Sequence, residues 1–342
     1  MRLLLALLIP LAGCTGLRVH VGAHMLASGL YAIERYDATI SERGILRADP
    51  ETEVVKRVRY ARLWHVDAEV LSPAEHKGER FVFDGETLSV WWPRYFFGLR
   101  VRNLTVPPRN EVGDAIFSNT EWLLNRYEVD EHPAAPVAGR AVEEWVCTPD
   151  EPAPWRFPYQ AAMDTRYFVP LRLDVQDHEG QPWYSMRFDT IDFEAEVPAD
   201  AFAFEFPEGA IVHDWDLAAP GVSLAEADER TEFPVLLPEH LPPGHALKQV
   251  LLSDHGDVHG VALIMNHRAR WLSLSEIPNM GPILVPELGL PVQIGEHEGV
   301  LNFVFGFTVI SWAVDTTALT LIGNLPYPQL IEVAASVRPR GE

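Results

Sequence analysis

The sequence predicts an α+β fold, in which a large antiparallel sheet with few helices precedes a smaller α+β domain. Three observations predict it. Many short segments alternate with the period of half-buried strands, helical periodicity is confined to a few stretches, and an acidic, Pro-containing segment separates two strand-rich regions. With 342 residues, 47% apolar and 22% charged, the chain is long enough for two domains that each have a core.

The N-terminus predicts export and lipid attachment. Arg2 precedes a short apolar stretch, 3–11, which cannot span a bilayer as a helix and is typical of a signal peptide. The run Leu11-Ala12-Gly13-Cys14 resembles the lipobox of bacterial lipoproteins, which implies that Cys14 is acylated and becomes the mature N-terminus. A plain signal peptide with an incidental cysteine is the alternative.

The lipobox resemblance implies a signal peptide over 1–13 and a lipidated tether over 14–18. Several acyl chains anchor a protein stably, because each buried methylene contributes about 0.8 kcal/mol. No other apolar run approaches 18 residues. We therefore expect an exported cell-envelope protein, anchored by lipid to a membrane on its periplasmic or extracytoplasmic side; inner and outer membrane both stay open.

The region 19–210 is predicted to form the large sheet. Helix-like spacing begins near Val19 and returns over 115–127, and the rest has strand patterns. Apolar residues alternate with acidic ones over 191–197, which predicts one buried and one wet face. We expect a large antiparallel sheet curved around one or two helices. The clearest strands span 37–46, 54–64, 81–83, 87–92, 171–175 and 183–188.

Two turns predict hairpins in this region. Asp84-Gly85 stands between the strands at 81–83 and 87–92, and 177–180 stands between those at 171–175 and 183–188. Both turns contain the Asp and Gly residues that tight turns prefer.

A series of short motifs over 137–209 resembles the LolA-like superfamily, which includes periplasmic lipoprotein carriers and the sigma-factor regulators of the RseB (MucB) family. The resemblance implies an unclosed β-barrel with helices across its open side and an apolar concave face that suits acyl chains. The pieces are Val137-Ala138-Gly139-Arg140-Ala141, Met163-Asp164-Thr165-Arg166, Val169-Pro170-Leu171-Arg172, 177–180, the strand 188–193, Pro198-Ala199-Asp200-Ala201-Phe202 and Pro207-Glu208-Gly209.

The densest aromatic stretch is a candidate ligand-binding site. Strict alternation sends its side chains to both faces of a sheet, and Pro93 predicts a break in the strand. The stretch is interpreted as the rim or floor of a ligand cavity, as an aromatic edge that contacts a membrane, or as ordinary packing against helices. Its candidate ligand-binding residues are Trp91, Trp92, Tyr95, Phe96 and Phe97.

The C-terminal part predicts a second, smaller domain over 233–338, after a linker at 211–232. A Pro-rich extended segment is followed by strands and by a helix near 328–336. This part resembles an uncharacterised domain that is often appended to LolA-like lipoproteins and to anti-sigma-type regulators. The predicted strands span 247–252, 258–266, 271–275, 300–304, 309–314 and 318–322.

Composition and missing motifs argue against several functions. The formal charge of −22 disfavours nucleic acid and anionic membrane surfaces. The sequence has no phosphate-binding loop, nucleophile elbow or zinc-protease motif, so we predict no catalytic residue, metal or cofactor. The segment 254–259 is interpreted as a turn, His20 and His24 as helix residues, and Cys147 as a small buried apolar residue.

The sequence features bear on three functions. A tethered regulator like RseB would bind an acyl ligand or an envelope partner and would pass the signal to a membrane anti-sigma factor. A carrier or acceptor would move lipid or lipoprotein between membranes, although a permanent tether argues against free shuttling. An enzyme is disfavoured, because no catalytic constellation supports one. A neighbouring sigma or anti-sigma gene would favour the regulator, and neighbouring export genes the carrier.

Overall fold

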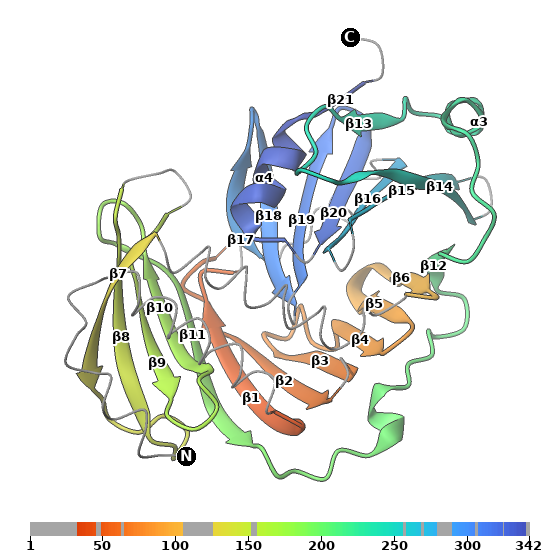
Figure 1. The fold of residues 1–342 in the computed structure, drawn as a ribbon. Coiled ribbons are helices and arrows are strands. Elements are labelled where there is room, and N and C mark those ends of the chain that lie inside the picture. The colour runs from red at the N-terminus through yellow and green to blue at the C-terminus, as the bar shows by residue number, and fades with distance from the viewer. Residues whose placement is uncertain are drawn as a thin grey trace, which may run out of the picture.

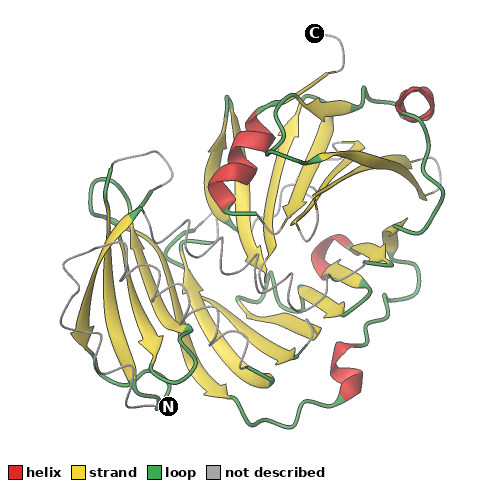
Figure 2. Ribbon diagram, viewed as in Figure 1, coloured by secondary structure: helices red, strands yellow, loops and turns green. Residues whose placement is uncertain are grey.

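The fold is known from a computed structural model, whose described residues form a 12-stranded sheet, a 7-stranded sheet and a two-stranded ribbon (Figures 1 and 2). The lipobox Cys14, the signal peptide and the helix predicted at 19–30 lie outside the described residues. So does the helix predicted at 115–127, except for its last two residues. The structure describes residues 33–45, 49–62, 65–104, 126–151, 156–255, 258–267, 270–278, 289–304, 307–323 and 325–339.

The larger sheet has 12 strands and is antiparallel except at one edge. It curves without closing, as Figure 1 shows, and the second sheet lies within the curve. In spatial order its strands are β12 (Ile211–Asp216), β6 (Phe97–Arg102), β5 (Leu88–Trp92), β4 (Arg80–Asp84), β3 (His65–Ser72), β2 (Val54–Ala61), β1 (Arg35–Arg43), β11 (Pro182–Asp192), β10 (Pro170–Gln176), β9 (Tyr159–Asp164), β8 (Val142–Pro149) and β7 (Tyr127–Pro133).

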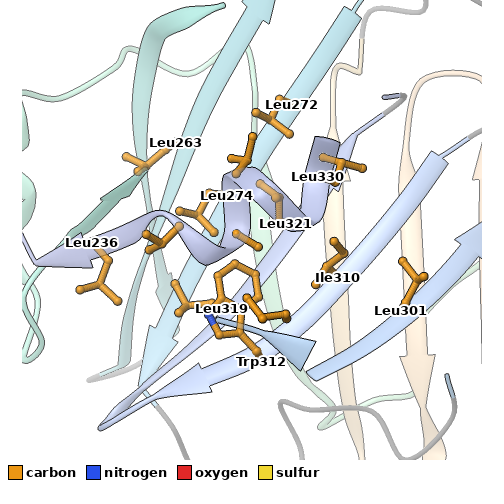
Figure 3. Close-up of a cluster of buried hydrophobic side chains, with 14 of the residues drawn as sticks. Leu236, Leu263, Leu272, Leu274, Leu301, Ile310, Trp312, Leu319, Leu321 and Leu330 are labelled. Atoms are coloured by element: carbon orange, nitrogen blue, oxygen red, sulfur yellow. The ribbon is translucent and has the colours of Figure 1, made fainter. Parts of the chain in front are cut away.

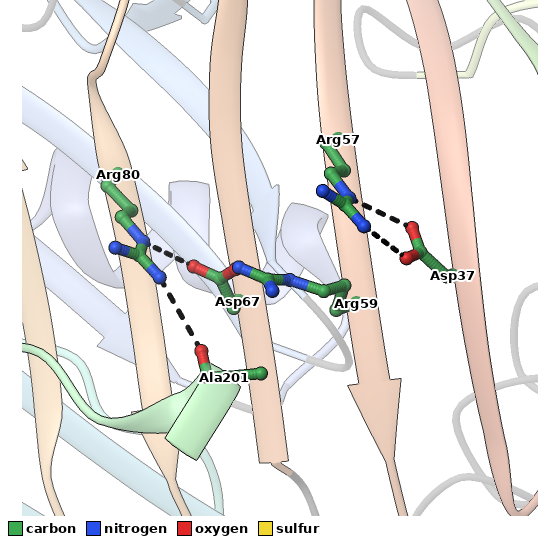
Figure 4. Close-up of polar contacts among 6 residues, drawn as sticks. All are labelled: Asp37, Arg57, Arg59, Asp67, Arg80 and Ala201. Carbon is green, nitrogen blue, oxygen red and sulfur yellow. Dashed lines mark hydrogen bonds and ion pairs between the residues drawn. The ribbon is translucent and has the colours of Figure 1, made fainter. Parts of the chain in front are cut away.

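Strand pairing defines an inner and an outer face, because partners in register share a face. The inner face, turned toward the second sheet, is apolar. Across neighbouring strands it carries Tyr36, Val58, Val66, Phe83, Val101 and Trp215. The outer face carries charged pairs, including Asp37, Arg57, Arg59, Asp67 and Arg80 (Figure 4).

Residues 199–210, which we name the strap, cross the outer face after β11. The strap begins with the short 3-10 helix η3 (Ala199–Phe202), which packs against β3 and β4. Two of its aromatic side chains point toward the outer face of the sheet. The Phe204 ring lies under the Arg80 guanidinium, and the Phe206 ring lies under the Arg100 guanidinium. The strap carries the chain from one side of the sheet to β12, which pairs in parallel with β6.

The segment 211–232, predicted as a linker, has regular secondary structure. It contains the strand β12 and the helix α3 (Leu224–Arg230). Ser223 caps the N-terminus of this helix, because its side chain accepts a hydrogen bond from the amide of Glu226. The strand went unrecognised because its inward positions include His213, which alternates with Val212 and Asp214. The division into domains at the predicted boundaries stays a prediction.

The second sheet has 7 strands and its own core. The helix α4 (Tyr327–Ala335) packs on it with Leu330, Val333 and Ala334, and the ribbon of β13 (Leu236–Pro238) and β21 (Val337–Pro339) closes one side (Figure 3). In spatial order the strands are β14 (Ala246–His255), β15 (Val258–His267), β16 (Arg270–Pro278), β20 (Thr317–Gly323), β19 (Phe307–Val314), β18 (His297–Val304) and β17 (Leu290–Ile294).

The two sheets share buried surface. Leu251, Ala262 and Ile264 of the second sheet belong to the same apolar cluster as Val101 and Trp215 of the inner face. His213 Nδ1 lies 3.3 Å from Ser253 Oγ across this contact, and the amide of Gly289 donates to the carbonyl of Ile45 at 2.6 Å. The inner face above β3–β6 and β12 is therefore covered by the second sheet.

Most of the predicted strands, both hairpins and the C-terminal helix are confirmed. The strand predicted over 191–197 is wrong beyond Asp192, where β11 ends, because Asp192 Oδ1 accepts from the amide of Glu194 and turns the chain. β4 pairs with β5, β10 pairs with β11, and Asp177 Oδ1 accepts from two amides in the second turn. The fold is mostly β-sheet, and Figure 2 shows few helices among the described residues: η2 (Pro93–Tyr95), η3, α3 and α4. The helix predicted across 115–127 is wrong at its described end, because Tyr127 begins β7.

Candidate functional site

The aromatic stretch forms the turn between β5 and β6 and splits between the two faces, as its alternation predicts. Pro93 ends β5 and begins η2, and Phe96 then adopts a left-handed conformation with φ of 51°. This turn reverses the chain, so that Trp92 and Phe97 stand opposite each other in the hairpin.

Three of the five candidate residues face inward. The Trp92 and Phe97 rings lie 5.8 Å apart, and Tyr95 and Trp92 pack with Phe97 against Ile277 and Ala318 of the second sheet. This arrangement makes the inward aromatics part of the contact between the sheets. Their role in ligand binding stays a prediction.

The other two candidates face outward. Trp91 is buried beneath Phe96 and the strap residue Phe206, with ring centroids 5.6 and 5.9 Å away. Gly98 lies directly under Phe206, because a Cβ atom at this position would sit 2.1 Å from the ring. Phe96 remains 45% exposed, the largest exposed fraction of any large apolar side chain described.

A second apolar cluster lies on the inner face over β7–β10. Trp145 and Ala161 pair across β8 and β9, Leu173 pairs with Ala161, and the register continues from Leu173 to Met186. Trp145, Ala161 and Leu173 therefore share the inner face with Met186. The cluster consists of Tyr127, Trp145, Cys147, Ala161 and Met163, with Val129, Tyr159 and Leu173 packed against it.

Two polar atoms of this cluster decide its chemistry. Trp145 Nε1 is buried and has no hydrogen-bond acceptor in the described part of the chain. Burial raises the pKa of the Cys147 thiol to about 11, although a hydrogen bond with Tyr159 opposes this shift. Cys147 is therefore a neutral buried thiol, as predicted. Trp145 was not predicted as a site residue, because Val146 between Trp145 and Cys147 is also apolar and hides the alternation of buried and half-buried positions.

A pocket of about 240 Å³ opens at the start of β1. The Tyr167 and Phe193 rings stack there with centroids 4.2 Å apart, and Ile33 completes the apolar wall. Glu34 and Glu194 stand at its mouth. The space is smaller than typical ligand sites of about 300–1,000 Å³.

The motifs that carry the family resemblance have structural roles beside this pocket. Arg140 Nε donates to Asp164 Oδ2 at 2.5 Å, and the guanidinium lies over the Phe193 ring at 4.6 Å. Asp164 Oδ1 accepts from the amides of Arg166 and Tyr167. The pieces at 137–141, 163–166 and 188–193 are thus held together by one buried ion pair.

Burial alone would raise the pKa of Asp164. The hydrogen bond from Arg140 and those from the Tyr167 and Arg166 amides outweigh burial, and they hold the pKa below its ordinary value. The carboxylate is therefore ionised at neutral pH.

The other polar candidates do not assemble into a reactive site. His and acidic residues form no metal-binding group within the described ranges. Of the segment 254–259, the described residues end β14 and begin β15, where Asp254 and His259 are cross-strand partners. His20 and His24 lie outside the described residues. No helix in the described part of the chain combines the length and the apolar character that crossing a bilayer requires.

The curved, unclosed antiparallel sheet with an apolar inner face places this protein in the half-barrel class. Residues 100–205 match the family model described as the MucB/RseB N-terminal domain. This match confirms the RseB-like assignment of this segment, which contains the second apolar cluster and all the motifs up to η3.

Several solved structures are similar to the chain. MucB is 15% identical, with 95% of this chain and 98% of that chain covered and a TM-score of 0.47. A MucA/MucB complex from Pseudomonas aeruginosa is 15% identical, with 95% of this chain and 100% of that chain covered and a TM-score of 0.43. A LolA superfamily protein from Nitrosomonas europaea is 10% identical, with 54% of this chain and 97% of that chain covered and a TM-score of 0.26. No curated protein matches the chain.

Proposed function

We propose that the chain is a membrane-anchored envelope regulator of the RseB kind. It binds an acyl ligand on the inner face of the half-barrel, and it binds an anti-sigma-type membrane partner whose activity it controls. The match of residues 100–205 to the MucB/RseB N-terminal domain carries the proposal. One similar structure contains MucB in complex with MucA.

The cluster around Trp145 is the proposed acyl site. Its members carry aromatic, thioether and thiol groups, and an acyl chain inserted among them would bury its own apolar area. An unpaired indole N–H in such a place costs about 1–3 kcal/mol, and an ester or amide carbonyl of the ligand would remove that cost. A carbonyl next to an acyl chain is what lipids and lipoproteins share.

The anchor is the lipid on Cys14. In this proposal the protein stays at the membrane surface, where its partner resides. The net charge of −22 keeps it from adsorbing electrostatically to anionic lipid, so the acyl group alone selects the location.

Calorimetric titration of the full chain with the periplasmic part of an anti-sigma-type membrane protein, encoded beside its gene, tests the proposal. We expect saturable binding that a synthetic lipopeptide weakens in the wild-type chain. Trp145→Phe keeps an aromatic ring, although a smaller one, and removes the N–H; it should reduce the lipopeptide effect while preserving partner binding. Val129→Ala, a change at the periphery of the cluster that leaves the N–H in place, is the matched control.

A failure of partner binding would overturn the regulator function. If the chain instead transferred a lipopeptide to acceptor vesicles, the carrier function would replace it. Transfer and partner binding are separate readouts, so the two functions cannot be confused.

A further inference from the structure

The strand β7 is one edge of the large sheet, and within the described ranges no strand pairs with its outer side. The opposite edge strand, β12, lies against the second sheet, where His213 Nδ1 is 3.3 Å from Ser253 Oγ of β14. The outer side of an edge strand presents a row of backbone donors and acceptors, with which another extended segment can pair. β7 is therefore the edge of this sheet at which a strand could be added.

The register identifies the backbone groups that face outward. The amide of Asp150 donates to the carbonyl of Arg126 at 3.0 Å, and the bonds of an antiparallel ladder recur at every second residue. Every second residue after Arg126 therefore bonds to β8, whereas Val129 and Glu131 turn their N–H and C=O groups to the open side. Pro133 lies in the same series, where its missing N–H removes no bond to β8. The edge thus offers two complete pairs of donor and acceptor.

The side chains along this edge are acidic. The segment 127–149 contains five acidic residues, and its one Lys or Arg, Arg140, is bound to Asp164. Such an edge repels nucleic acid and a second copy of itself, and it attracts a segment of positive charge. Four carboxylates are exposed and have no ion-pair partner in the described part of the chain: Glu128, Asp130 and Glu131 of β7 and Glu143 of β8.

We infer that β7 pairs with an extended, basic segment of a protein partner, which in the proposed regulator is the anti-sigma-type membrane protein. The identity of the partner rests on that proposed function, whereas the edge and its charge do not. The added strand would lie beside the proposed acyl site, because Tyr127 belongs to that cluster and Val129 packs against it. An acyl chain that entered the cluster would shift these β7 side chains. Ligand and partner would thus act on the same strand.

Glu131→Pro in the full chain tests the pairing. Proline removes the outward N–H and blocks an added strand, while the bonds to β8 stay, because position 131 makes none of them. Glu131→Ala loses the same charge but keeps the N–H, and is the matched control. The probes are a synthetic peptide of alternating lysine and valine and the periplasmic part of the proposed partner. In calorimetric titrations, Glu131→Pro should bind each probe about ten-fold more weakly than Glu131→Ala.

Charge reversal tests the acidic character without changing the backbone. Glu128→Lys combined with Asp130→Lys should weaken binding of both probes and flatten its dependence on salt, because attraction becomes repulsion. Glu51→Lys combined with Glu86→Lys changes the net charge equally at exposed positions away from β7, and is the control. Equal weakening by the two double variants would overturn the inference, and so would equal affinities of the two position-131 variants.

Hydrogen exchange at single amides distinguishes the remaining outcomes. The Val129 and Glu131 amides should exchange fast in the free chain and slowly in each complex. Slow exchange in the free chain, or protection that appears only at raised protein concentration, would show an edge paired within the molecule or with a second copy, and would overturn the inference. Partner binding that leaves both amides fast would overturn it while the regulator function stands. Peptide protection without partner binding would support the edge and overturn the regulator function.

Discussion

At the scale of single residues, the outer face depends on Asp67. This carboxylate is almost fully buried between two arginines: Arg59 Nε donates to Oδ2 at 2.9 Å and Arg80 Nε to Oδ1 at 2.5 Å (Figure 4). Arg80 also reaches the Ala201 carbonyl of the strap at 3.5 Å. A single buried charge therefore holds β2, β3, β4 and η3 together.

Removing that charge should be costly. Asp67→Asn leaves two guanidinium groups facing each other, and we expect a loss of about 3 kcal/mol in the free energy of unfolding. Asp37→Asn breaks an exposed pair with Arg57 and should cost less than about 1 kcal/mol. Urea denaturation of both variants measures the difference, and equal losses would contradict this role of Asp67.

Asp164 gives a prediction about pH. Its pKa is below the ordinary value in the folded state, so it stabilises the fold at a pH above its unfolded pKa of about 3.9 and loses this contribution as pH falls. We expect Asp164→Asn to cost about 2 kcal/mol at pH 7 and progressively less below about pH 4. Denaturation midpoints at several pH values test this; Asp174→Asn, in an exposed pair with Arg172, is the control. A pH-independent loss would be inconsistent with it.

At the scale of elements, the strap is fixed by the packing of Phe206 on Gly98. A methyl group on Gly98 would overlap the ring, so Gly98→Ala should displace Phe206 and destabilise the protein by about 1–3 kcal/mol. Phe206→Leu removes the obstacle, and the double variant should lose less stability than the sum of the two single changes. Additive losses in a double-mutant cycle would show that the two residues are not coupled.

The elements also show which parts of the fold the sequence could predict. Hairpins with Asp-Gly turns were predictable, because turn and strand period agree there. The clean alternation over 191–197 misled, because Asp192 turns the chain by accepting from the amide of Glu194. β12 was not predictable, because His213 occupies an apolar position and its pairing with β6 needs the strap to cross the sheet. The aromatic split around Pro93 was predictable from alternation, whereas the burial of Trp145 depends on its packing with Ala161 and the other residues of the cluster over the neighbouring strands β7–β10.

At the scale of the whole molecule, the two sheets share a buried contact and should unfold together. Phe97 packs on Ala318, next to the inner-face cluster that contains Leu251 and Trp215. Phe97→Ala should cost about 3–5 kcal/mol and should separate the single transition into two. Phe204→Ala, on the outer face, should lower stability without splitting the transition. Calorimetry distinguishes these outcomes, and a single transition for Phe97→Ala would argue against coupling through this contact.

The central claim is that the inner face over β7–β10 holds an acyl ligand. Native mass spectrometry of the full chain, purified from bacterial membranes and released gently from detergent, tests it most directly. We predict a bound acyl-containing species in addition to the anchor, retained in the Val129→Ala control and depleted in Trp145→Phe. A chain with no such species, and with no uptake of added phospholipid or lipopeptide, would contradict the claim.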